Sequence, residues 1–206
     1  MATDEELEAE GIAQTRVKGG DVREILADWE SNPMRKPRLA KVIINIAVGQ
    51  SGEILKKAST VIESISGQKP TLAEAKRSVK EFNIRKKENI ATFVTLRGKR
   101  AEDFLKRVLV LTDNRLRYKC FDNMGNFSLG VTEHIQIPGT KYDPEVGIFG
   151  LNVNVRLERP GIRVRRRRKF RGQVGFNQYV TKAEAELFME KFFGVELVEK
   201  IEARYY

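Results

Sequence analysis

The chain holds a single histidine, His134, and a single cysteine, Cys120, so nucleophilic or metal chemistry would depend on these two side chains. A Ser-His-Asp or Cys-His site needs an imidazole base, and a structural zinc site needs about four Cys or His ligands. His134 lies in an alternating apolar stretch, which is typical of a structural histidine, and Cys120 beside Phe121 is interpreted as a buried small residue. No phosphate-binding glycine loop, dinucleotide fingerprint or nucleophile elbow is present. The sequence therefore predicts a protein that is not an enzyme and uses no metal or cofactor.

Positive charge is the main chemical feature of the chain, which has 38 Lys and Arg, 28 Asp and Glu, and a net charge of +10. Much of it lies in two runs: 156–171 has nine basic residues and one acid, and 76–88 has six basic residues and two acids. Blocks of one sign repel one another, so an anionic partner is expected, and the usual one is a nucleic-acid backbone. The alternative is that both runs are ordinary solvated loops.

Thirteen basic side chains in these runs are candidate RNA contacts. They are Lys76, Arg77, Lys80, Arg85, Lys86 and Lys87 in the first run, and Arg163, Arg165, Arg166, Arg167, Arg168, Lys169 and Arg171 in the second. The second run contains nothing that could bury a core, so we expect it to be disordered without RNA.

Charge and length also divide the chain into regions. Residues 1–31 hold nine acids and three basic residues, and 1–20 is predicted to be a flexible acidic extension. A single domain is predicted over 21–195, with a basic loop at 76–89 and an Arg-rich loop at 159–175, followed by a tail over 196–206. The N-terminus resembles no leader, cysteine is scarce, and no apolar run approaches the ~18 residues of a membrane span. We therefore expect a cytoplasmic protein that does not bind membranes.

The spacing of apolar residues predicts the elements that position these side chains. The predicted strands are residues 39–48, 71–75, 90–97, 127–131, 134–137 and 148–157, and the predicted helices are 21–29, 54–65, 101–109 and 181–193. Ser51 is expected to cap the second helix, and Thr181 with Glu184 forms a capping box for the last. Because the long strands alternate between apolar and polar residues, we expect an antiparallel sheet with helices on one face, a two-layer α+β fold.

The same alternation collects polar side chains on the sheet face that the helices leave uncovered. These residues are Asn45, Phe93, Thr95, Arg97, Asn152, Asn154 and Arg156. Such a face suits sugar and phosphate contacts, and Phe93 could stack on a base. Asn is depleted in strands, so three of them favour a binding surface over the alternative, an ordinary solvated face.

Several motifs occur in an order that resembles the universal ribosomal protein L-five family of the large subunit. They are Asn32 to Gly49, Ile65 to Pro70, Ala75 to Val79, Val94 to Gly98, Phe121 to Val131, and Gly150 to Val155. The resemblance covers roughly 31–194. The arginine-rich insertion after Arg159 and the segment Phe170 to Tyr179 resemble the archaeal and eukaryotic branch.

The resemblance implies a sheet backed by helices, no catalytic activity, and a structural role at 5S rRNA in the central protuberance. It places the polar 5S rRNA motif positions on Asn45, Gln68, Thr95 and Arg97, with Lys69 in the same turn as Gln68. It also implies that 76–87 faces the peptidyl-site tRNA, and that the protein bridges to a small-subunit head protein. Large-subunit rRNA and other central-protuberance ribosomal proteins are further expected partners, and no homo-oligomer is expected.

Two other functions stay open at this point. An RNA-processing enzyme would have to use His134. A peripheral membrane protein would need a basic amphipathic helix beside the arginine run, whereas the helix from Thr181 is expected to have Glu184, Glu186 and Glu190 on its polar side.

Overall fold

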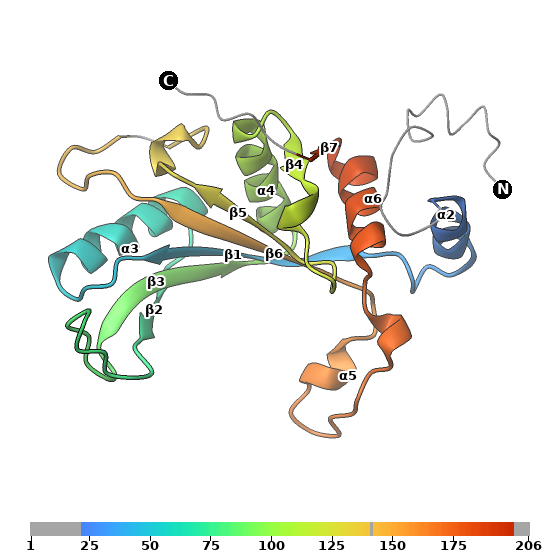
Figure 1. Cartoon of the computed structure of the whole chain (residues 1–206), viewed down its shortest axis with the longest axis horizontal. Helices are drawn as coiled ribbons and strands as arrows, with labels where there is room; N and C mark the ends of the chain where they lie inside the picture. Colours follow the sequence, from blue (N-terminus) through green and yellow to red (C-terminus); the bar gives the residue numbers. More distant parts are fainter. Residues whose placement is uncertain (1–21, 141, 200–206) are drawn as a thin grey trace.

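The computed structural model describes residues 22–140 and 142–199 (Figure 1). The predicted acidic extension over 1–20 therefore lies outside the described residues, as does most of the predicted C-terminal tail. Within the described ranges, no helix has both the length and the apolar character needed to cross a membrane.

The centre of the fold is a five-stranded antiparallel sheet in the order β2-β3-β1-β6-β5. The strands are β1 (Arg38–Ala47), β2 (Thr71–Glu74), β3 (Asn89–Leu96), β5 (Phe127–Val131) and β6 (Leu151–Glu158). In the central strand, Val42, Ile44 and Ile46 are buried, whereas the residues between them are only half-buried. The predicted alternation is therefore confirmed, and it gives the sheet one apolar face and one polar face.

The long helices lie on the apolar face. In Figure 1, α3 (Glu53–Ser66) and α4 (Lys99–Leu111) lie on the same side of the sheet, and buried side chains of both helices join its core. The helices α6 (Lys182–Phe193) and α2 (Val22–Ser31) add Leu187, Met189 and Trp29 to that core. The predicted two-layer α+β fold is confirmed, and the uncovered polar side is called the open face below.

The helix ends follow the predicted signals with one exception. Gly67 ends α3 in a left-handed conformation with φ of 63°, and the capping box of Thr181 and Glu184 is present at the start of α6. The exception is Ser51, because Gly52 is the N-cap of α3. The Ser51 hydroxyl donates instead to Glu88 Oε1 at 2.5 Å, a contact between segments far apart in sequence.

The helix α6 also differs from its expected polarity. Glu184 and Glu186 were expected on its polar side, but both are buried, and Glu186 is 0% exposed. Glu184 is buried because it serves the capping box and pairs with the buried Arg159. Sequence periodicity cannot show this, because an ion pair lets a carboxylate occupy a buried position.

Three short segments differ from the predicted elements. The segment 134–137 is a 3₁₀ turn, η3 (His134–Gln136), rather than a strand. β6 begins at Leu151 rather than at 148, because its neighbour β5 ends at Val131, the partner of Leu151. Three residues that were assigned to the tail, Glu196–Val198, form β7, which pairs in parallel with β4 (Arg115–Arg117). Neither short strand carries a strong local pattern.

Candidate nucleic-acid interface

The strand register aligns polar side chains in rows across the open face. Asn45 pairs with Phe93 on one side and Asn152 on the other, and Phe93 in turn pairs with Thr71. Directly paired residues of neighbouring strands lie about 4.5–5.5 Å apart. Amide, hydroxyl and aromatic groups from four strands therefore form one continuous row.

A second row lies beside the first. Ile43 pairs with Thr95 and with Asn154, and Asn154 pairs with Ser128 of the edge strand β5. The predicted Thr95 and Asn154 are therefore one row from Asn45 and Asn152, and the sheet brings all four together. Ile43 makes the centre of the face apolar, and it was not expected there although it obeys the same alternation.

Positive charge gathers at one end of the open face. Lys41 pairs with Arg156, and Arg97 directly follows β3. Partial burial and the neighbouring guanidinium groups of Arg156, Arg97 and Arg166 lower the pKa of Lys41. Cations this close repel one another, so an anion bound among them would relieve the repulsion. Lys41 was missed in the sequence, although the alternation that selected Asn45 also places Lys41 on this face.

One carboxylate holds part of this cationic cluster. Glu158 lies at the end of β6, is 5% exposed, and forms ion pairs with Arg156 at 2.7 Å and with Arg166. Arg166 belongs to α5 (Arg163–Arg166), the one helical turn of the predicted Arg-rich loop. That the run is disordered without RNA stays a prediction, and Arg166 pairs with a carboxylate of the sheet. We call residues 159–179 the Arg-rich arm.

Six other basic side chains of the arm face solvent, whereas Arg159 is buried. Arg163, Arg165, Arg167, Arg168, Lys169 and Arg171 are all exposed. Arg165 donates to the Tyr179 hydroxyl at 2.6 Å, and Arg167 donates to the Phe170 carbonyl at 2.6 Å. The arm therefore has internal contacts while most of its charge faces outward.

The predicted Gln68 and Lys69 lie in the turn between α3 and β2. Both are exposed, and the backbone N–H of Gln68 donates to the Ser66 hydroxyl at 3.3 Å. Because Thr71 pairs with Phe93 in antiparallel fashion, the residues before Thr71 lie toward the Thr95 end of β3. The turn thus extends the polar rows beyond the edge of the sheet.

The basic loop between β2 and β3 is a short hairpin, which we call the basic hairpin (75–88). Val79 and Ile84 exchange backbone hydrogen bonds of 2.9 and 3.1 Å, and Asn83 turns the chain with φ of 56°. Asn tolerates this left-handed conformation better than most residues. The six predicted basic side chains, Lys76, Arg77, Lys80, Arg85, Lys86 and Lys87, are all exposed. The predicted loop end at 89 is one residue too late, because Asn89 begins β3.

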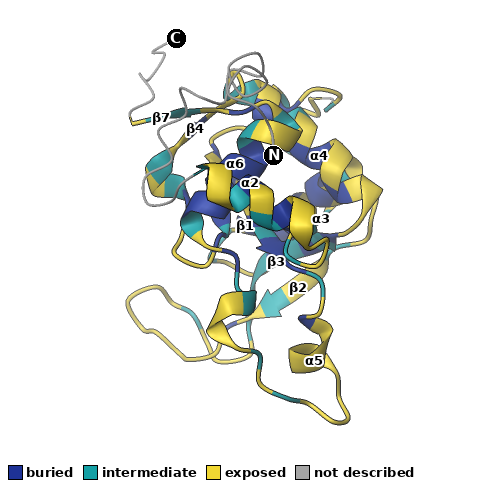
Figure 2. Cartoon of the chain, turned by 90° about the vertical axis from the view of Figure 1, so that its right-hand side faces the viewer, coloured by how far each residue is buried: buried dark blue, intermediate teal, exposed yellow. Residues whose placement is uncertain are grey.

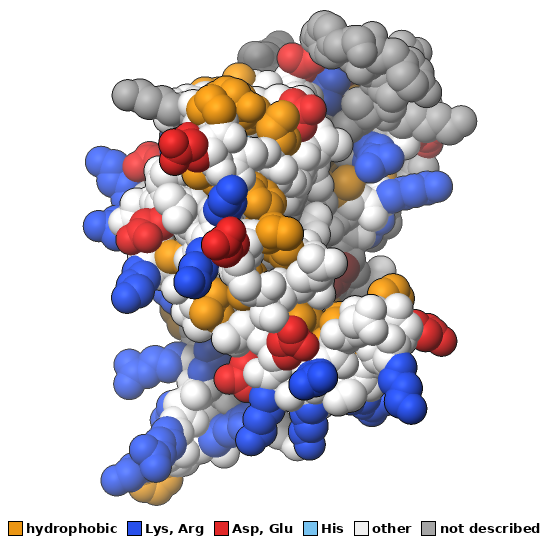
Figure 3. Space-filling view, turned by 90° about the vertical axis from the view of Figure 1, so that its left-hand side faces the viewer, with side chains coloured by type: hydrophobic (Ala, Val, Ile, Leu, Met, Phe, Trp, Pro, Cys, Tyr) orange, Lys and Arg blue, Asp and Glu red, His pale blue; other side chains and the backbone are white. Residues whose placement is uncertain are grey.

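Both basic extensions project away from the helices. In Figure 1 the basic hairpin and the Arg-rich arm lie below the sheet at opposite ends, whereas α4 lies above it. Figure 2 shows that the ribbon of both extensions is mostly exposed. Figure 3 shows Lys and Arg side chains gathered along the same lower edge. The open face is therefore flanked by two cationic extensions.

Glu88 fastens the neck of the basic hairpin. Its carboxylate accepts the Ser51 hydroxyl and, at 2.9 Å, the Arg85 amide, and these two hydrogen bonds lower the pKa of Glu88 below its ordinary value of 4.5. A lowered pKa means that the contacts persist at pH 4.5 and above and are lost as pH falls through the lowered pKa.

We expect Glu88→Gln to remove this pH dependence, because an amide side chain does not titrate there. The measurement is the protection of the Arg85 amide against hydrogen exchange as a function of pH. The control is Glu81→Gln, which changes an exposed residue at the hairpin tip and should leave the Arg85 profile as in the wild type. A wild-type profile that stays flat below pH 4.5 would contradict the proposed anchor.

The two residues that could have supported nucleophilic chemistry have structural positions. His134 is 3% exposed, and its Nδ1 accepts a hydrogen bond from the Phe149 backbone amide at 3.2 Å. Burial lowers the pKa of His134. Cys120 is half-buried rather than buried as expected. Over 22–140 and 142–199, no group of three or more His, Cys, Asp or Glu could hold a metal ion.

Comparison with family models matches nearly the whole described chain. Residues 32–85 match the model described as Ribosomal protein L5, and residues 89–192 match the model for the C-terminus of the same ribosomal protein family. The two matched ranges contain the strands of the open face, the Arg-rich arm and the basic hairpin up to Arg85.

Curated relatives agree over the same region. The chain is 48% identical over 178 residues to the large ribosomal subunit protein uL5 of Aeropyrum pernix, which covers 86% of this chain and 93% of that protein. It is 48% identical over 169 residues to uL5 of Sulfurisphaera tokodaii, with coverages of 82% and 96%. For uL5 of Nitrosopumilus maritimus the identity is 44% over 170 residues, with coverages of 82% and 98%.

Proposed function

Because the chain belongs to the ribosomal protein L5 family, of the archaeal and eukaryotic type, we propose that its open face binds 5S rRNA. The family is structural rather than enzymatic. The chain is accordingly a structural protein of the large ribosomal subunit in the cytoplasmic ribosome, and it partners with rRNA and other ribosomal components.

The observation that carries the proposal is the pair of polar rows that ends in a cationic cluster. Asn45, Gln68 and Thr95 can donate and accept hydrogen bonds, and they suit 2′-hydroxyl groups and base edges. Arg97, Arg156 and Lys69 suit phosphates, which fix the position of an RNA without reading its sequence. Asn152 and Asn154 extend the rows toward β5.

The two basic extensions give the proposal two further contacts. The family resemblance implies that the basic hairpin faces the peptidyl-site tRNA, and its six exposed cations on a short, hydrogen-bonded projection suit tRNA phosphates. The Arg-rich arm would lie along large-subunit rRNA. The proposed bridge to a small-subunit head protein and the contacts with other proteins of the central protuberance rest on the family resemblance alone.

Filter binding of the full chain to 5S rRNA over a series of salt concentrations tests the proposal. A protein that neutralises Z phosphates loses affinity with a logarithmic slope of about −0.7Z to −0.9Z, and Arg97→Gln should reduce that slope by about one. Arg97→Gln should weaken binding to every structured RNA by a similar factor, because a phosphate contact carries no sequence information. The proposal fails if affinity is independent of salt, or if unrelated structured RNAs bind as tightly as 5S rRNA.

A further inference from the structure

The Arg-rich arm contains a hollow whose lining includes no residue of the sheet. Its volume is about 580 Å³, which falls in the ~300–1,000 Å³ range of small-ligand sites. The lining consists of Arg165, Arg171, Gly172, Gln173, Val174, Phe176 and Tyr179. The lining therefore combines two guanidinium groups, two aromatic rings and one amide, and it includes no acidic side chain.

The two rings have different surroundings. The Tyr179 ring is covered by the Arg165 guanidinium, 5.7 Å from the ring centroid, and the Tyr179 hydroxyl accepts a hydrogen bond from the same group. Phe176 lies 6.4 Å from Tyr179, centroid to centroid, with the rings tilted by 50°. This spacing and tilt leave no room for a planar base between the rings. Phe176 is 88% exposed, so its ring offers the open stacking surface.

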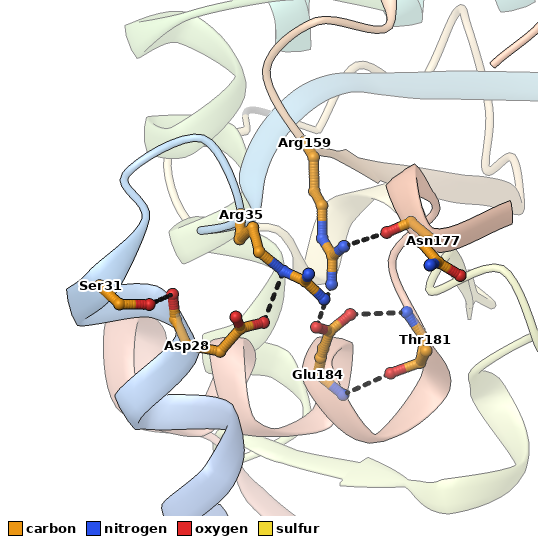
Figure 4. Close-up of polar contacts among 7 residues, drawn as sticks. All are labelled: Asp28, Ser31, Arg35, Arg159, Asn177, Thr181 and Glu184. Atoms are coloured by element: carbon orange, nitrogen blue, oxygen red, sulfur yellow. Dashed lines mark hydrogen bonds and ion pairs between the residues drawn. The ribbon is translucent and has the colours of Figure 1, made fainter. Parts of the chain in front are cut away.

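Phe176 is held on a rigid support although it is exposed. It begins η4 (Phe176–Gln178), and the next residue, Asn177, accepts a hydrogen bond through its carbonyl from the buried Arg159. Figure 4 shows Arg159 between Asn177 and Glu184, at the first turn of α6. On the other side of η4, Gln178 donates through its side chain to the Pro160 carbonyl at 2.5 Å. These hydrogen bonds fix the backbone beside Phe176, so a ligand that stacks on the ring has to order only its side-chain torsions.

We infer that this hollow binds one unpaired RNA nucleotide, with its base stacked on Phe176 and its phosphate bound by Arg171 and Arg165. Base stacking on an aromatic side chain beside arginines is the usual chemistry of single-stranded RNA recognition. The Gln173 amide can donate to or accept from the edge of the base. The inference rests on the proposed function, since it assigns the Arg-rich arm a particular contact with rRNA.

The test compares variants of the full chain that bind a short single-stranded oligoadenylate. Phe176→Ala should lower the affinity about tenfold, because stacking on one base is worth about 1–3 kcal/mol. Phe170→Ala is the matched control: Phe170 lies on the same arm and is 86% exposed, but it does not line the hollow, so the affinity should change less than about twofold. Phe176→Trp should retain the affinity, and the fluorescence of the new indole should be quenched when the oligoadenylate binds.

Other outcomes would overturn the inference. One is an unchanged affinity in Phe176→Ala, and another is an equal loss in Phe170→Ala. If Phe176→Ala lowers the affinity for a blunt RNA duplex as much as the affinity for oligoadenylate, the site binds phosphate alone. If Phe176→Ala impairs assembly into large subunits but not oligoadenylate binding, the ring contacts a protein instead. Failure of the wild type to prefer 5S rRNA would overturn the proposed function separately, because the oligoadenylate comparison does not involve the open face.

Discussion

Replacing Asn45, Gln68 and Thr95 together with Ala is expected to lower the affinity for 5S rRNA about 100-fold. Each lost hydrogen bond is worth about 1 kcal/mol, and three lost bonds correspond to roughly a factor of 100 in the dissociation constant. The fold should be unaffected, because all three side chains lie on the uncovered side of the sheet or in an exposed turn. Surface substitutions of this kind usually change stability by less than about 0.5 kcal/mol.

The matched control replaces the same residue types elsewhere on the surface. Asn32, Thr60 and Gln136 are exposed and lie outside the sheet, so their triple replacement by Ala should leave 5S rRNA affinity unchanged. Filter binding at one salt concentration gives the comparison, and thermal unfolding of both variants shows whether the domain is intact. Equal affinity of the two triple variants would show that the polar rows do not contact 5S rRNA.

The open face could be predicted from the sequence because its signal is local. Alternation within a single strand determines which side of the sheet each residue faces. The predicted buried and uncovered residues of 90–97 and 151–157 therefore agree with the burial observed in β3 and β6. The same rule would have placed Lys41 on this face beside the predicted Arg97 and Arg156. Register between strands, which aligns Asn45 with Phe93 and Asn152, is a property of the assembled sheet.

The features that the sequence did not predict depend on contacts between distant segments. Ser51 is typical of an N-cap, yet its hydroxyl binds Glu88, 37 residues away. The arginine run is typical of a disordered segment, yet Glu158 at the end of β6 pairs with Arg166 and holds one turn of the run against the open face. A local pattern cannot show which carboxylate will lie beside which cation.

These long-range contacts also explain how a strongly basic arm can be ordered in part. Glu158 offsets the repulsion between Arg156 and Arg166, and Arg159 is directed inward, where it supports the turn that presents Phe176. The other cations remain in solvent and keep their capacity to bind phosphate. The arm therefore divides its arginines between positioning the chain and contacting a partner.

Arg159→Ala is expected to lower the free energy of unfolding by about 3–5 kcal/mol, the usual cost of breaking a buried ion pair from one side. The Arg159 side chain is 2% exposed and pairs with the buried Glu184, and it also donates to the Asn177 carbonyl. Without the Arg159 guanidinium, the buried Glu184 carboxylate and the Asn177 carbonyl lose this partner. Since domains are stable by only about 5–15 kcal/mol, urea unfolding should show the loss clearly.

Two further variants separate the ion pair from general effects of charge. Arg166→Ala removes an arginine that is partly exposed, and Arg156 remains beside Glu158, so the loss should be no more than about 1 kcal/mol. The double variant Arg159→Met with Glu184→Leu should recover most of the stability, except for about 1 kcal/mol lost with the capping box of α6.

The same double variant removes the Arg159 bond to Asn177, so it should weaken oligoadenylate binding even where stability is recovered. Equal stability of Arg159→Ala and the wild type would show that the pair does not hold the arm to α6.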